Sequence, residues 1–510
     1  MVPALGHESV VAVIGAGAMG TGIAQVATQA GHPVRLFDTR SGAAARAVSD
    51  IRVSLAKLAA KGKIDATAAG AAGDRLSVAD STSDLADASL VVEAIVERLD
   101  VKTELFLEIE RIVRDDCILA SNTSSISITS IAAGLRRPQR VVGLHFFNPA
   151  PLMALVEVVS GLSTDPVVAE AAYQTAKAWG KTPVHARSTP GFIVNRVARP
   201  FYAEGLRLLS EGAADVETID AVMREAGGFR MGPFELMDLI GNDVNYAVTC
   251  SVFDAYYGDP RFAPSVIQQE LVNAGHLGRK SGRGFYDYSL GAKGASQSSE
   301  PPAALVGRVT VWTSNALGAA LASRLRHAGV QVDERRVAHS DGRTATVDHT
   351  VMALTDGRSA TQRAADMQHE ALVLHDVVLD PVKSGRIAIA VADRCSPSGR
   401  QAATAMLQAA GFVVSRLDDV PGMAVMRTVA MLANEAMEVV HHQVCDAVSA
   451  DLAMCKGVNY PRGPLAWADE IGPRHVLRVL DHLALAYGED RYRASALMRR
   501  RVAGRQPLLG

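Results

Sequence analysis

A glycine-rich turn near the N-terminus constrains the fold of this chain more than any other feature. The short apolar run Val10–Ile14 leads directly into Gly15-Ala16-Gly17-Ala18-Met19-Gly20, and a helical stretch over 19–30 follows. In such a strand–turn–helix unit the first glycine permits a tight turn, the second lets a pyrophosphate approach the backbone, and the third lets the helix pack closely on the strand. The N-terminus of the helix adds free N–H groups and a positive dipole. The pattern therefore predicts a doubly wound α/β domain that binds a dinucleotide.

A carboxylate after the second predicted strand indicates which dinucleotide binds. The strand pattern over 34–38 follows the helix and ends in Asp38. A carboxylate at this distance from the glycines accepts hydrogen bonds from the adenosine ribose and repels a 2′-phosphate. We therefore expect NAD, and Arg40, which lies just beyond Asp38, keeps NADP as an alternative.

The pattern over 10–190 continues to alternate strands and helices. Further strands are expected at 90–95, 117–121, 141–147 and 155–160, and helices at 42–61 and 100–114. Strands that alternate with helices build a largely parallel sheet covered on both faces. The last two strands are close together in the sequence, so we expect a change of direction at that edge.

Helical spacing of apolar residues replaces this alternation over 190–288, which predicts a helical domain. The segment 289–304 is rich in Ser, Gly, Ala and Pro without periodicity and predicts a linker.

The part of the chain after the linker repeats the part before it. When Pro190 is set on Pro421, the two segments stay aligned without a gap as far as Gly241 and Gly472. The same alignment pairs Gly191 with Gly422, Arg196 with Arg427, Glu204 with Glu435, Gly232 with Gly463 and Asp238 with Asp469. So many matches at one offset predict a duplication. We call 8–288 the first copy and 305–510 the second copy.

The second copy is shorter and has lost its glycine turn. The interval from Gly20 to Pro190 corresponds to the much shorter interval from Gly318 to Pro421, and we expect the missing part to include the polar strand ends described below. Thr313-Ser314-Asn315 replace the first glycines and Arg336 replaces Asp38, which predicts no second dinucleotide site.

The predicted fold class is thus α/β plus all-α, with a truncated, degenerate copy of both. The predicted domains are an N-terminal Rossmann-type doubly wound domain at 8–189, a helical domain at 190–288, a degenerate Rossmann-like domain at 305–418 and a second helical domain at 419–510.

Composition excludes several classes of function. The 510 residues carry a net charge of −2, so the chain lacks the global basic surface of a nucleic-acid-binding protein. No apolar run approaches the ~20 residues that span a bilayer, and the N-terminus lacks a secretory pattern. The five cysteines show no metal-ligand spacing. We therefore expect free thiols, no metal site, no membrane partner and a cytoplasmic location.

Polar residues stand where a parallel sheet presents the carboxyl ends of its strands. They are Ser121-Asn122-Thr123-Ser124-Ser125, His145 in HFFNP, Glu157 in LVEVV, and Asn195 one turn into the first helix of the helical domain. A carboxylate in a valine run is costly to bury unless it is paired, and a histidine is the natural partner. A His–Glu pair beside a cofactor is a general base with its orienting group. Taken singly, these residues also fit structural roles, such as a capping loop or a helix-start hydrogen bond.

The order of these motifs resembles the L-3-hydroxyacyl-CoA dehydrogenase family. The resemblance covers about 8 to 288 and rests on GAGAMG, VEAIVE (92–97), SNTSS, HFFNP, TPGFIVNR (189–196), MGPFEL (231–236) and GRKSGRGFYDY (278–288). The duplicated remainder resembles the longer bacterial members, which are linked to 3-hydroxybutyryl-CoA or 3-hydroxyadipyl-CoA. The sequence does not distinguish these two acyl groups.

The resemblance implies reversible, NAD-dependent oxidation of a soluble (S)-3-hydroxyacyl-CoA thioester. It implies His145 as general base, Glu157 as its orienting group, and Ser124 and Asn195 as hydrogen-bonding partners of the substrate. The implied NAD contacts are Gly15, Ala16, Gly17, Ala18, Met19, Gly20, Asp38, Glu97, Lys102, Ser124, Asn148 and Lys280. The implied coenzyme A contacts are Ser54, Lys61 and Ser124, although Lys61 also fits a solvated surface role.

The second copy predicts one active site per chain, because Met426 stands where Asn195 stands in the first copy. We hypothesise that it is an internal pseudo-dimer partner of the first copy, and a further homo-oligomer is left open. Two other functions also stay open. One is a β-hydroxy-acid dehydrogenase that acts on a free acid, and the other is a non-catalytic nicotinamide-sensing or structural protein.

Overall fold

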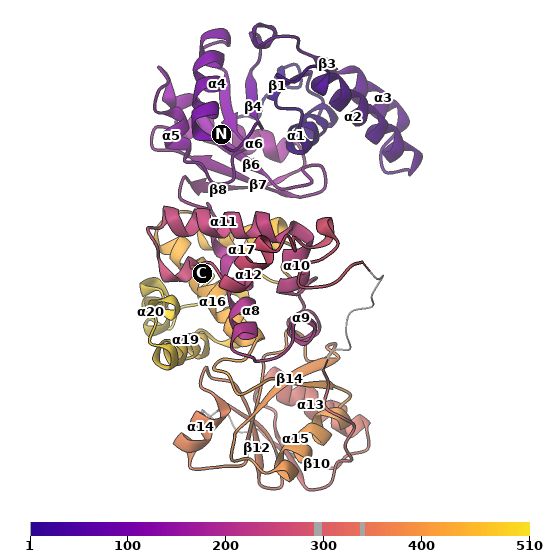
Figure 1. Cartoon of the computed structure of the whole chain (residues 1–510), viewed down its shortest axis with the longest axis vertical. Coiled ribbons are helices and arrows are strands. Elements are labelled where there is room, and N and C mark those ends of the chain that lie inside the picture. The colour runs from indigo at the N-terminus through magenta and orange to yellow at the C-terminus, as the bar shows by residue number, and fades with distance from the viewer. Residues whose placement is uncertain (1, 290–297, 337–341) are drawn as a thin grey trace. The chain divides into compact units, whose positions relative to one another are not determined.

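The computed structural model describes residues 2–289, 298–336 and 342–510, which form two compact units (Figure 1). The first unit combines the residues up to Arg196 with His442–Val458, and the second combines Val197–His441 with Asn459–Gly510. The units therefore do not follow the predicted domain limits, because 442–458 of the second copy group with the first copy. The part of the predicted linker at 290–297 lies outside the described residues.

The first unit is built on an eight-stranded sheet with the order β3-β2-β1-β4-β5-β6-β7-β8. Its strands are β1 (Val11–Ile14), β2 (Val34–Phe37), β3 (Leu76–Val78), β4 (Leu90–Glu93), β5 (Ile118–Ser121), β6 (Val141–Phe146), β7 (Leu155–Ser160) and β8 (Thr182–Arg187). Neighbouring strands are parallel except β6 and β7, which run antiparallel. The order reverses between β1 and β4, so the glycine turn after β1 lies at the switch point where open α/β sheets bind their ligands.

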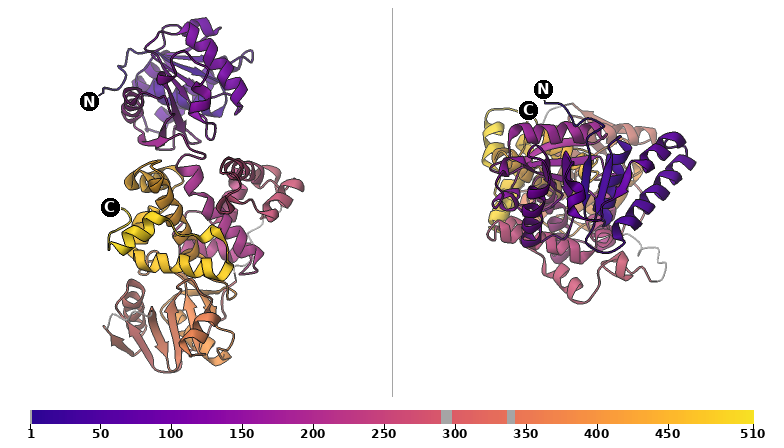
Figure 2. Two further views of the ribbon diagram at one scale, coloured as in Figure 1. Left: turned by 90° about the vertical axis from the view of Figure 1, so that its left-hand side faces the viewer. Right: turned by 90° about the horizontal axis from the view of Figure 1, so that it is seen from above.

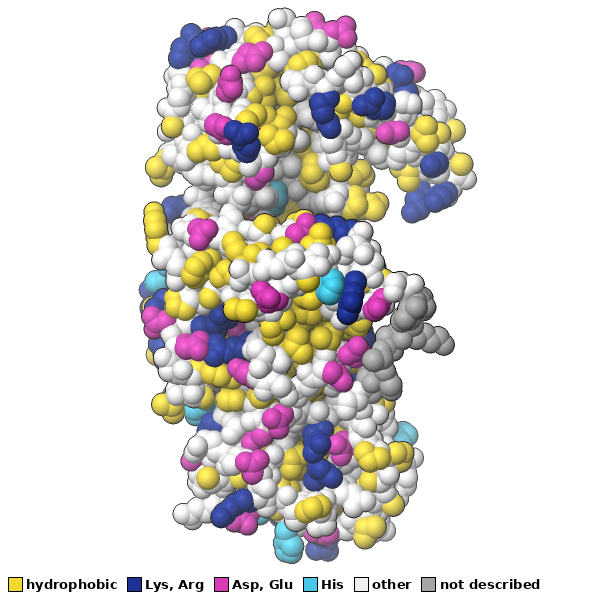
Figure 3. All heavy atoms as spheres, in the orientation of Figure 1, with side chains coloured by type: hydrophobic (Ala, Val, Ile, Leu, Met, Phe, Trp, Pro, Cys, Tyr) yellow, Lys and Arg dark blue, Asp and Glu magenta, His cyan; other side chains and the backbone are white. Residues whose placement is uncertain are grey.

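Helices flank this sheet, and most of them pack against its strands. They are α1 (Ala18–Gln29), α2 (Ala43–Ala60), α3 (Ala66–Asp74), α4 (Leu99–Ile112), α5 (Ile128–Ala132), α6 (Pro166–Ala178), α7 (Val194–Val197, which ends at the boundary of the unit) and α17 (Ala447–Gly457). Helices α2 and α3 pair with each other and project beyond β3 (Figure 1), and Lys and Arg side chains gather at their tip (Figure 3).

This architecture confirms the predicted fold class, but two strands of the first sheet were not predicted. Strand β3 is very short and most of it is exposed, so it lacks an apolar alternation. Strand β8 carries Pro183, and proline within a run argues against a central strand. Both strands lie at the edges of the sheet, where shortness and proline are tolerated.

The second unit contains helices of both copies and a second sheet (Figure 2). Its first-copy helices are α8 (Arg199–Ser210), α9 (Val216–Glu225), α10 (Pro233–Ile240), α11 (Asn242–Ala255) and α12 (Val266–Asn273). Its second-copy helices are α13 (Ala316–His327), α14 (Ala360–Met367), α15 (Pro397–Ala409), α16 (Val425–His441), α18 (Pro464–Ile471), α19 (Pro473–Tyr487) and α20 (Ala496–Ala503). Helix α16 is buried along almost its whole length and packs against α8, α18 and α19.

Among the described residues, the second sheet reproduces the first without a counterpart of β3 and with one strand reversed. Its order is β10-β9-β11-β12-β13-β14-β15. The strands are β9 (Val309–Trp312), β10 (Val332–Arg335), β11 (Arg343–Val347), β12 (Thr350–Leu354), β13 (Leu372–His375), β14 (Arg386–Val391) and β15 (Val413–Arg416). The directions of β12 to β15 match those of β5 to β8, whereas β11 is antiparallel to both its neighbours.

This topology corrects the predicted position of the lost segment. In the first copy α2, α3, β3, β4 and α4 separate β2 from β5. In the second copy β11 is the only strand that the described residues place between β10 and β12. The prediction that the polar strand ends are missing is therefore wrong, because β13 is the counterpart of β6 and ends in His375.

Candidate active site

The turn after β1 leaves its backbone open to a ligand. Gly15 has a φ of 105°, and a Cβ at this position would lie 2.5 Å from the Ala94 carbonyl oxygen. A Cβ at Gly17 would meet nothing within 4 Å, so the backbone beside the N-terminus of α1 faces free space. Ala16, Ala18, Met19 and Gly20 complete this turn and the start of the helix. The geometry fits a pyrophosphate, which needs close approach to backbone N–H groups.

Asp38 closes one side of this turn. Its Oδ2 accepts a hydrogen bond from the Ala16 N–H at 2.7 Å, and its Oδ1 accepts from the Arg40 N–H and Nε at 2.9 and 3.0 Å. The hydrogen bonds from the Arg40 side chain lower the pKa of Asp38 to about 2, so the carboxylate is charged at neutral pH. Asp38 lines a cavity of about 590 Å³ together with Gly15, Gly17, Phe37, Ile95 and Leu105.

A buried lysine lies between two carboxylates after β4. Lys102 is 1% exposed, and its Nζ lies 2.5 Å from Glu93 Oε1 and 3.3 Å from Glu97 Oε2. The second oxygen of Glu93 accepts a hydrogen bond from Ser121 Oγ at 2.6 Å. Glu93 was not among the predicted site residues, although its position in the VEAIVE motif, directly after a valine run, was an available signal.

Glu97 organises the serine-rich loop after β5. Its Oε1 accepts hydrogen bonds from Thr123 Oγ1 at 2.6 Å and from the Ser124 N–H at 2.9 Å. The Nδ2 of Asn195 donates to the Ser124 carbonyl oxygen at 3.4 Å. Ser124 and Asn195 are therefore neighbours, although they lie far apart in the sequence.

His145 and Glu157 form a close buried pair on neighbouring strands. They lie directly opposite each other in the antiparallel pairing of β6 and β7. The distance from His145 Nδ1 to Glu157 Oε2 is 2.6 Å, and Glu157 is fully buried. The ring of Phe147 packs against the imidazole with a centroid distance of 4.5 Å. This packing limits the directions in which the imidazole can turn.

The other oxygen of Glu157 binds the start of a helix. Its Oε1 accepts hydrogen bonds from the N–H groups of Ile193 and Val194, both at 3.0 Å. The carboxylate is thus held at the positive end of α7, which stabilises negative charge. Because a carboxylate accepts hydrogen bonds and does not donate them, Oε2 accepts the Nδ1 proton of His145.

Four predicted site residues lie outside this cluster. Asn148 is exposed after β6. Ser54 on α2 is half-buried, and Lys61 at the end of α2 is exposed two turns later on the same face. Lys280 belongs to the second unit, where its Nζ lies 2.6 Å from Asp243 Oδ1.

The second copy keeps some polar residues at the positions that correspond to this site, but they make different contacts. His375 ends β13 and is opposite Ile389, so no carboxylate stands at the position of Glu157. Asp376 instead accepts hydrogen bonds from the N–H groups of Ala424, Val425 and Met426 at the start of α16. At the former glycine turn, the side chain of Asn315 accepts from the Gly318 N–H at 2.8 Å and caps α13 itself.

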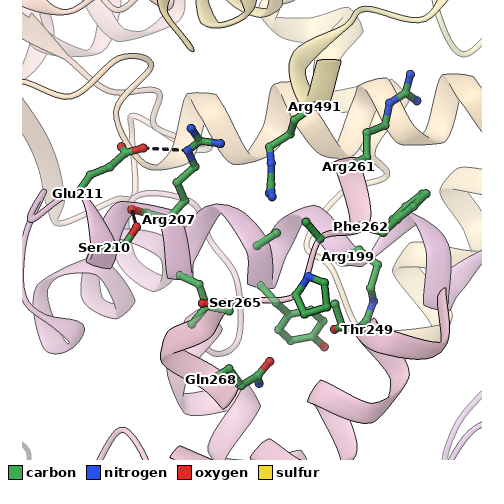
Figure 4. A pocket seen from close by; sticks show the side chains of 15 residues that line it. Arg199, Arg207, Ser210, Glu211, Thr249, Arg261, Phe262, Ser265, Gln268 and Arg491 are labelled. Carbon is green, nitrogen blue, oxygen red and sulfur yellow. Dashed lines mark hydrogen bonds and ion pairs between the residues drawn. The ribbon is translucent and has the colours of Figure 1, made fainter. Parts of the chain in front are cut away.

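A pocket of about 350 Å³ in the second unit contains arginines from both copies (Figure 4). Arg207 of the first copy binds Glu211 at 2.9 Å and Glu489 of the second copy at 2.7 Å. Arg261 lies 3.6 Å from Glu435, and Arg491 lies 4.0 Å from Glu204. Apart from the pair between Arg207 and Glu211, these ion pairs connect residues of one copy to residues of the other, so the pocket belongs to the packing between the copies.

The described part of the chain contains no group of three or more His, Cys, Asp and Glu side chains that could hold a metal ion. Among the same residues, no helix is both long enough and apolar enough to cross a bilayer. All five cysteines are free thiols.

Comparisons with known proteins match most of the chain. A model of the 3-hydroxyacyl-CoA dehydrogenase NAD-binding domain matches residues 10–189, and a model of the C-terminal domain of these enzymes matches residues 191–288 and 422–507. A model described as a 3-hydroxybutyryl-CoA dehydrogenase reduced Rossmann-fold domain matches residues 352–421.

Individual relatives extend over one or both copies. The 3-hydroxyadipyl-CoA dehydrogenase of Escherichia coli K12 is 44% identical over 96% of this chain and 97% of its own length. A probable 3-hydroxybutyryl-CoA dehydrogenase of Bacillus subtilis is 43% identical over 54% of this chain and 96% of its own. The crystal structure of an E. coli 3-hydroxybutyryl-CoA dehydrogenase superposes with a TM-score of 0.88 and 42% identity over 97% of this chain and 98% of that chain.

Proposed function

This chain belongs to the 3-hydroxyacyl-CoA dehydrogenase family, and we propose that His145, oriented by Glu157, is the general base with which it oxidises (S)-3-hydroxyacyl-CoA. As a member of this family it is an NAD-dependent oxidoreductase. The observation that carries the proposal is the 2.6 Å contact between His145 Nδ1 and Glu157 Oε2 in the unit that also holds the glycine turn.

The proton transfer follows from the way in which Glu157 is bound. Because Oε2 accepts the Nδ1 proton, the lone pair of Nε2 is free to take the proton of the substrate 3-hydroxyl. NAD, which the turn Gly15–Gly20 and Asp38 would hold, would supply the acceptor for the hydride that leaves C3. The charge of Glu157 then stabilises the imidazolium, and Ser124 and Asn195 hydrogen-bond the substrate oxygen. General-base catalysis of this kind contributes ~10²–10⁴-fold, and positioning contributes the remainder.

The cofactor and coenzyme A contacts are part of the same proposal. The turn Gly15–Gly20 and Asp38 hold the pyrophosphate and ribose of NAD, while Glu97, Lys102, Ser124, Asn148 and Lys280 complete its contacts. The buried pairing of Lys102 with Glu93 supports a role for Lys102 in holding Glu97 and the loop with Ser124. Ser54 and Lys61 share one face of α2 and receive the coenzyme A moiety, whose phosphates Lys61 attracts.

The second copy acts as an internal partner in this proposal, and two hydrogen bonds at equivalent positions of the two copies support it. The Arg187 N–H donates to the Val444 carbonyl oxygen at 2.9 Å, and the Asp418 N–H donates to the Ala213 carbonyl oxygen at 2.8 Å. Each bond joins a strand end of one copy to the other copy, as in a two-fold symmetric dimer. Arg261 and Arg491 each pair with a carboxylate of the opposite copy, which fits the same two-fold pattern.

The proposed location is the cytoplasm.

For the acyl group we propose adipyl, because a relative that is 44% identical over 96% of this chain is named for it. Butyryl is the alternative, because a solved structure that covers 97% of this chain is named for it. The test measures NADH formation by its absorbance with NAD and 3-hydroxyadipyl-CoA, 3-hydroxybutyryl-CoA or a free 3-hydroxy acid, with His145→Gln as the control. We expect turnover of a thioester that is lost in His145→Gln while NADH still binds.

Other outcomes of this test contradict the proposal. Oxidation of the free acid alone would identify a different β-hydroxy-acid dehydrogenase. NADH binding without turnover of any substrate would identify a nicotinamide sensor. A higher kcat/KM for the butyryl thioester would overturn only the choice of adipyl.

A further inference from the structure

A helix of the second copy covers the sheet that carries the proposed catalytic pair. Helix α17 lies in the same compact unit as the residues up to Arg196 and packs against β7 and β8. The segment before it is tied down at two points. The Val444 carbonyl accepts the Arg187 N–H, and His442 Nδ1 lies 3.4 Å from Arg196 Nη2.

Helix α17 makes a close approach to the first copy at its last residue, Gly457. A Cβ at this position would lie 2.7 Å from Leu155 Cδ2 and 3.1 Å from Val194 Cγ2. The same Cβ would lie 3.7 Å from Phe147 Cζ. The backbone of Gly457 is helical and its φ is not positive, so the absence of a side chain is required by space and not by conformation.

The three neighbours of Gly457 all adjoin the His145–Glu157 pair. Leu155 and Glu157 are next-but-one neighbours on β7, so their side chains lie on the same face of the sheet. Val194 donates its N–H to Glu157 Oε1, and the Phe147 ring packs on the imidazole. A shift of any of them moves a group that touches the pair.

We propose that Gly457 is a positioning residue for the dehydrogenase reaction, through which the second copy sets the geometry of His145 and Glu157. The inference rests on the proposed function of that pair. The second copy has lost its own chemistry, but through Gly457 it remains part of the catalytic apparatus of the first copy.

The duplication supplies a matched control. Ala226 is the counterpart of Gly457 in the alignment that pairs Pro190 with Pro421; it lies fully buried, and its carbonyl accepts the Leu379 N–H at 2.9 Å. It follows α9, which packs on β14 of the second sheet, where Ile389 stands in place of the carboxylate. Ala226→Val therefore enlarges the counterpart side chain beside a sheet that has no carboxylate opposite its histidine.

The test compares Gly457→Val and Ala226→Val in the full-length protein. We expect Gly457→Val to lower kcat about 10- to 100-fold, because small displacements of catalytic groups have effects of this size. The KM for the thioester and the Kd for NADH should change less than threefold. Ala226→Val should keep kcat within twofold of wild type, even if its melting temperature falls as far as that of Gly457→Val. The kcat values are calculated per NADH-binding site, so that unfolded protein does not lower them.

A second pair of variants separates position from stability. Gly457→Ala should lower kcat by a smaller factor, and adding Leu155→Val, which removes the Cδ2 atom that a Cβ would meet, should restore it. Gly457→Ala also replaces Gly457→Val in the comparison if the valine variant does not fold.

Three results would overturn the proposal. One is a normal kcat in Gly457→Val, another is an equal loss of kcat in Ala226→Val, and the third is a failure of Leu155→Val to rescue Gly457→Ala. The wild-type protein in the same assay tests the proposed function separately. If wild type does not oxidise the thioester, the proposed function is wrong. If wild type is active and Gly457→Val has a normal kcat, only the positioning role of Gly457 is wrong.

Discussion

At the scale of single residues, the two oxygens of Glu157 have different hydrogen-bond partners and therefore different roles. Oε2 faces His145, and Oε1 accepts the N–H groups of Ile193 and Val194. The sequence predicted the first contact, because a carboxylate in a valine run needs a partner. It could not predict the second, because the amides lie far along the chain and nothing in their side chains marks them.

Glu157→Gln should separate these tasks. The glutamine oxygen can still accept the helix amides, but its NH₂ group then faces His145 Nδ1 and forces that nitrogen to accept. The proton moves to Nε2, where it blocks proton abstraction, and we expect kcat to fall on the order of 10⁴-fold. Steady-state kinetics measure this loss, and NADH titration should show unchanged cofactor affinity. A kcat within tenfold of wild type would contradict the assigned tautomer.

His375 gives the second copy a pH dependence of its own. Burial lowers the pKa of His375 to about 4, and its Nε2 lies 2.7 Å from Thr344 Oγ1. Burial raises the pKa of the neighbouring Asp376 to about 6. As pH falls from 6.5 to 4, protonation of His375 favours the unfolded chain, whereas protonation of Asp376 favours the folded chain.

His375→Gln should therefore reduce sensitivity to acid. Below pH 6.5 the wild type loses stability at this histidine, up to about 3 kcal/mol near pH 4, and the variant does not. Urea unfolding at pH 4.5 and 7 measures the free energy of unfolding of both proteins. Because both retain Asp376, its contribution largely cancels in the comparison. Equal pH dependence of the two proteins would show that His375 titrates normally in the folded state.

At the scale of elements, what could be predicted depended on local pattern. Strands β1, β5, β6 and β7 and the helix after the glycine turn are marked by apolar runs and turn residues, and the sequence located them. The reversal of β11 and the position of α17 carry no such mark. Periodicity shows that a helix has an apolar face, but it does not show which sheet that face covers.

The contact between α8 and α16 depends on a fully buried ion pair. Arg427 Nε lies 2.6 Å from Glu204 Oε2, and both side chains are inaccessible to solvent. Arg427→Met should lower the free energy of unfolding by about 3–5 kcal/mol, because it leaves Glu204 charged and buried without that partner. The double variant Arg427→Met, Glu204→Leu should recover most of the loss, because removing both charges is often nearly neutral. Denaturant unfolding measures both. A double variant as unstable as the single one would assign the loss to packing.

At the scale of the whole molecule, the two copies exchange elements. Helix α17 of the second copy packs on the first sheet, and α9 of the first copy packs on the second sheet. Family relatives that span about half of this chain are matched over almost their whole length. The first copy alone therefore needs a substitute for the surfaces that α16 and α17 cover.

A protein that consists of 1–289 alone should find this substitute in a second molecule of itself. We expect it to dimerise, with activity per chain that rises with concentration, because α8 and β7 would otherwise expose apolar surface. Analytical ultracentrifugation and assays at nanomolar and micromolar concentrations measure both properties. A monomer with the full activity of the intact chain would leave the second copy without the role proposed here.

The grouping of 442–458 with the N-terminal unit has a consequence for synthesis on the ribosome. The glycine turn and both members of the proposed catalytic pair are translated before residues 197–441, but the helix that backs them is translated after these residues. A growing polypeptide can thus fold most of its nucleotide-binding half before α17 has been translated, and that half is complete only once α17 has emerged from the ribosome.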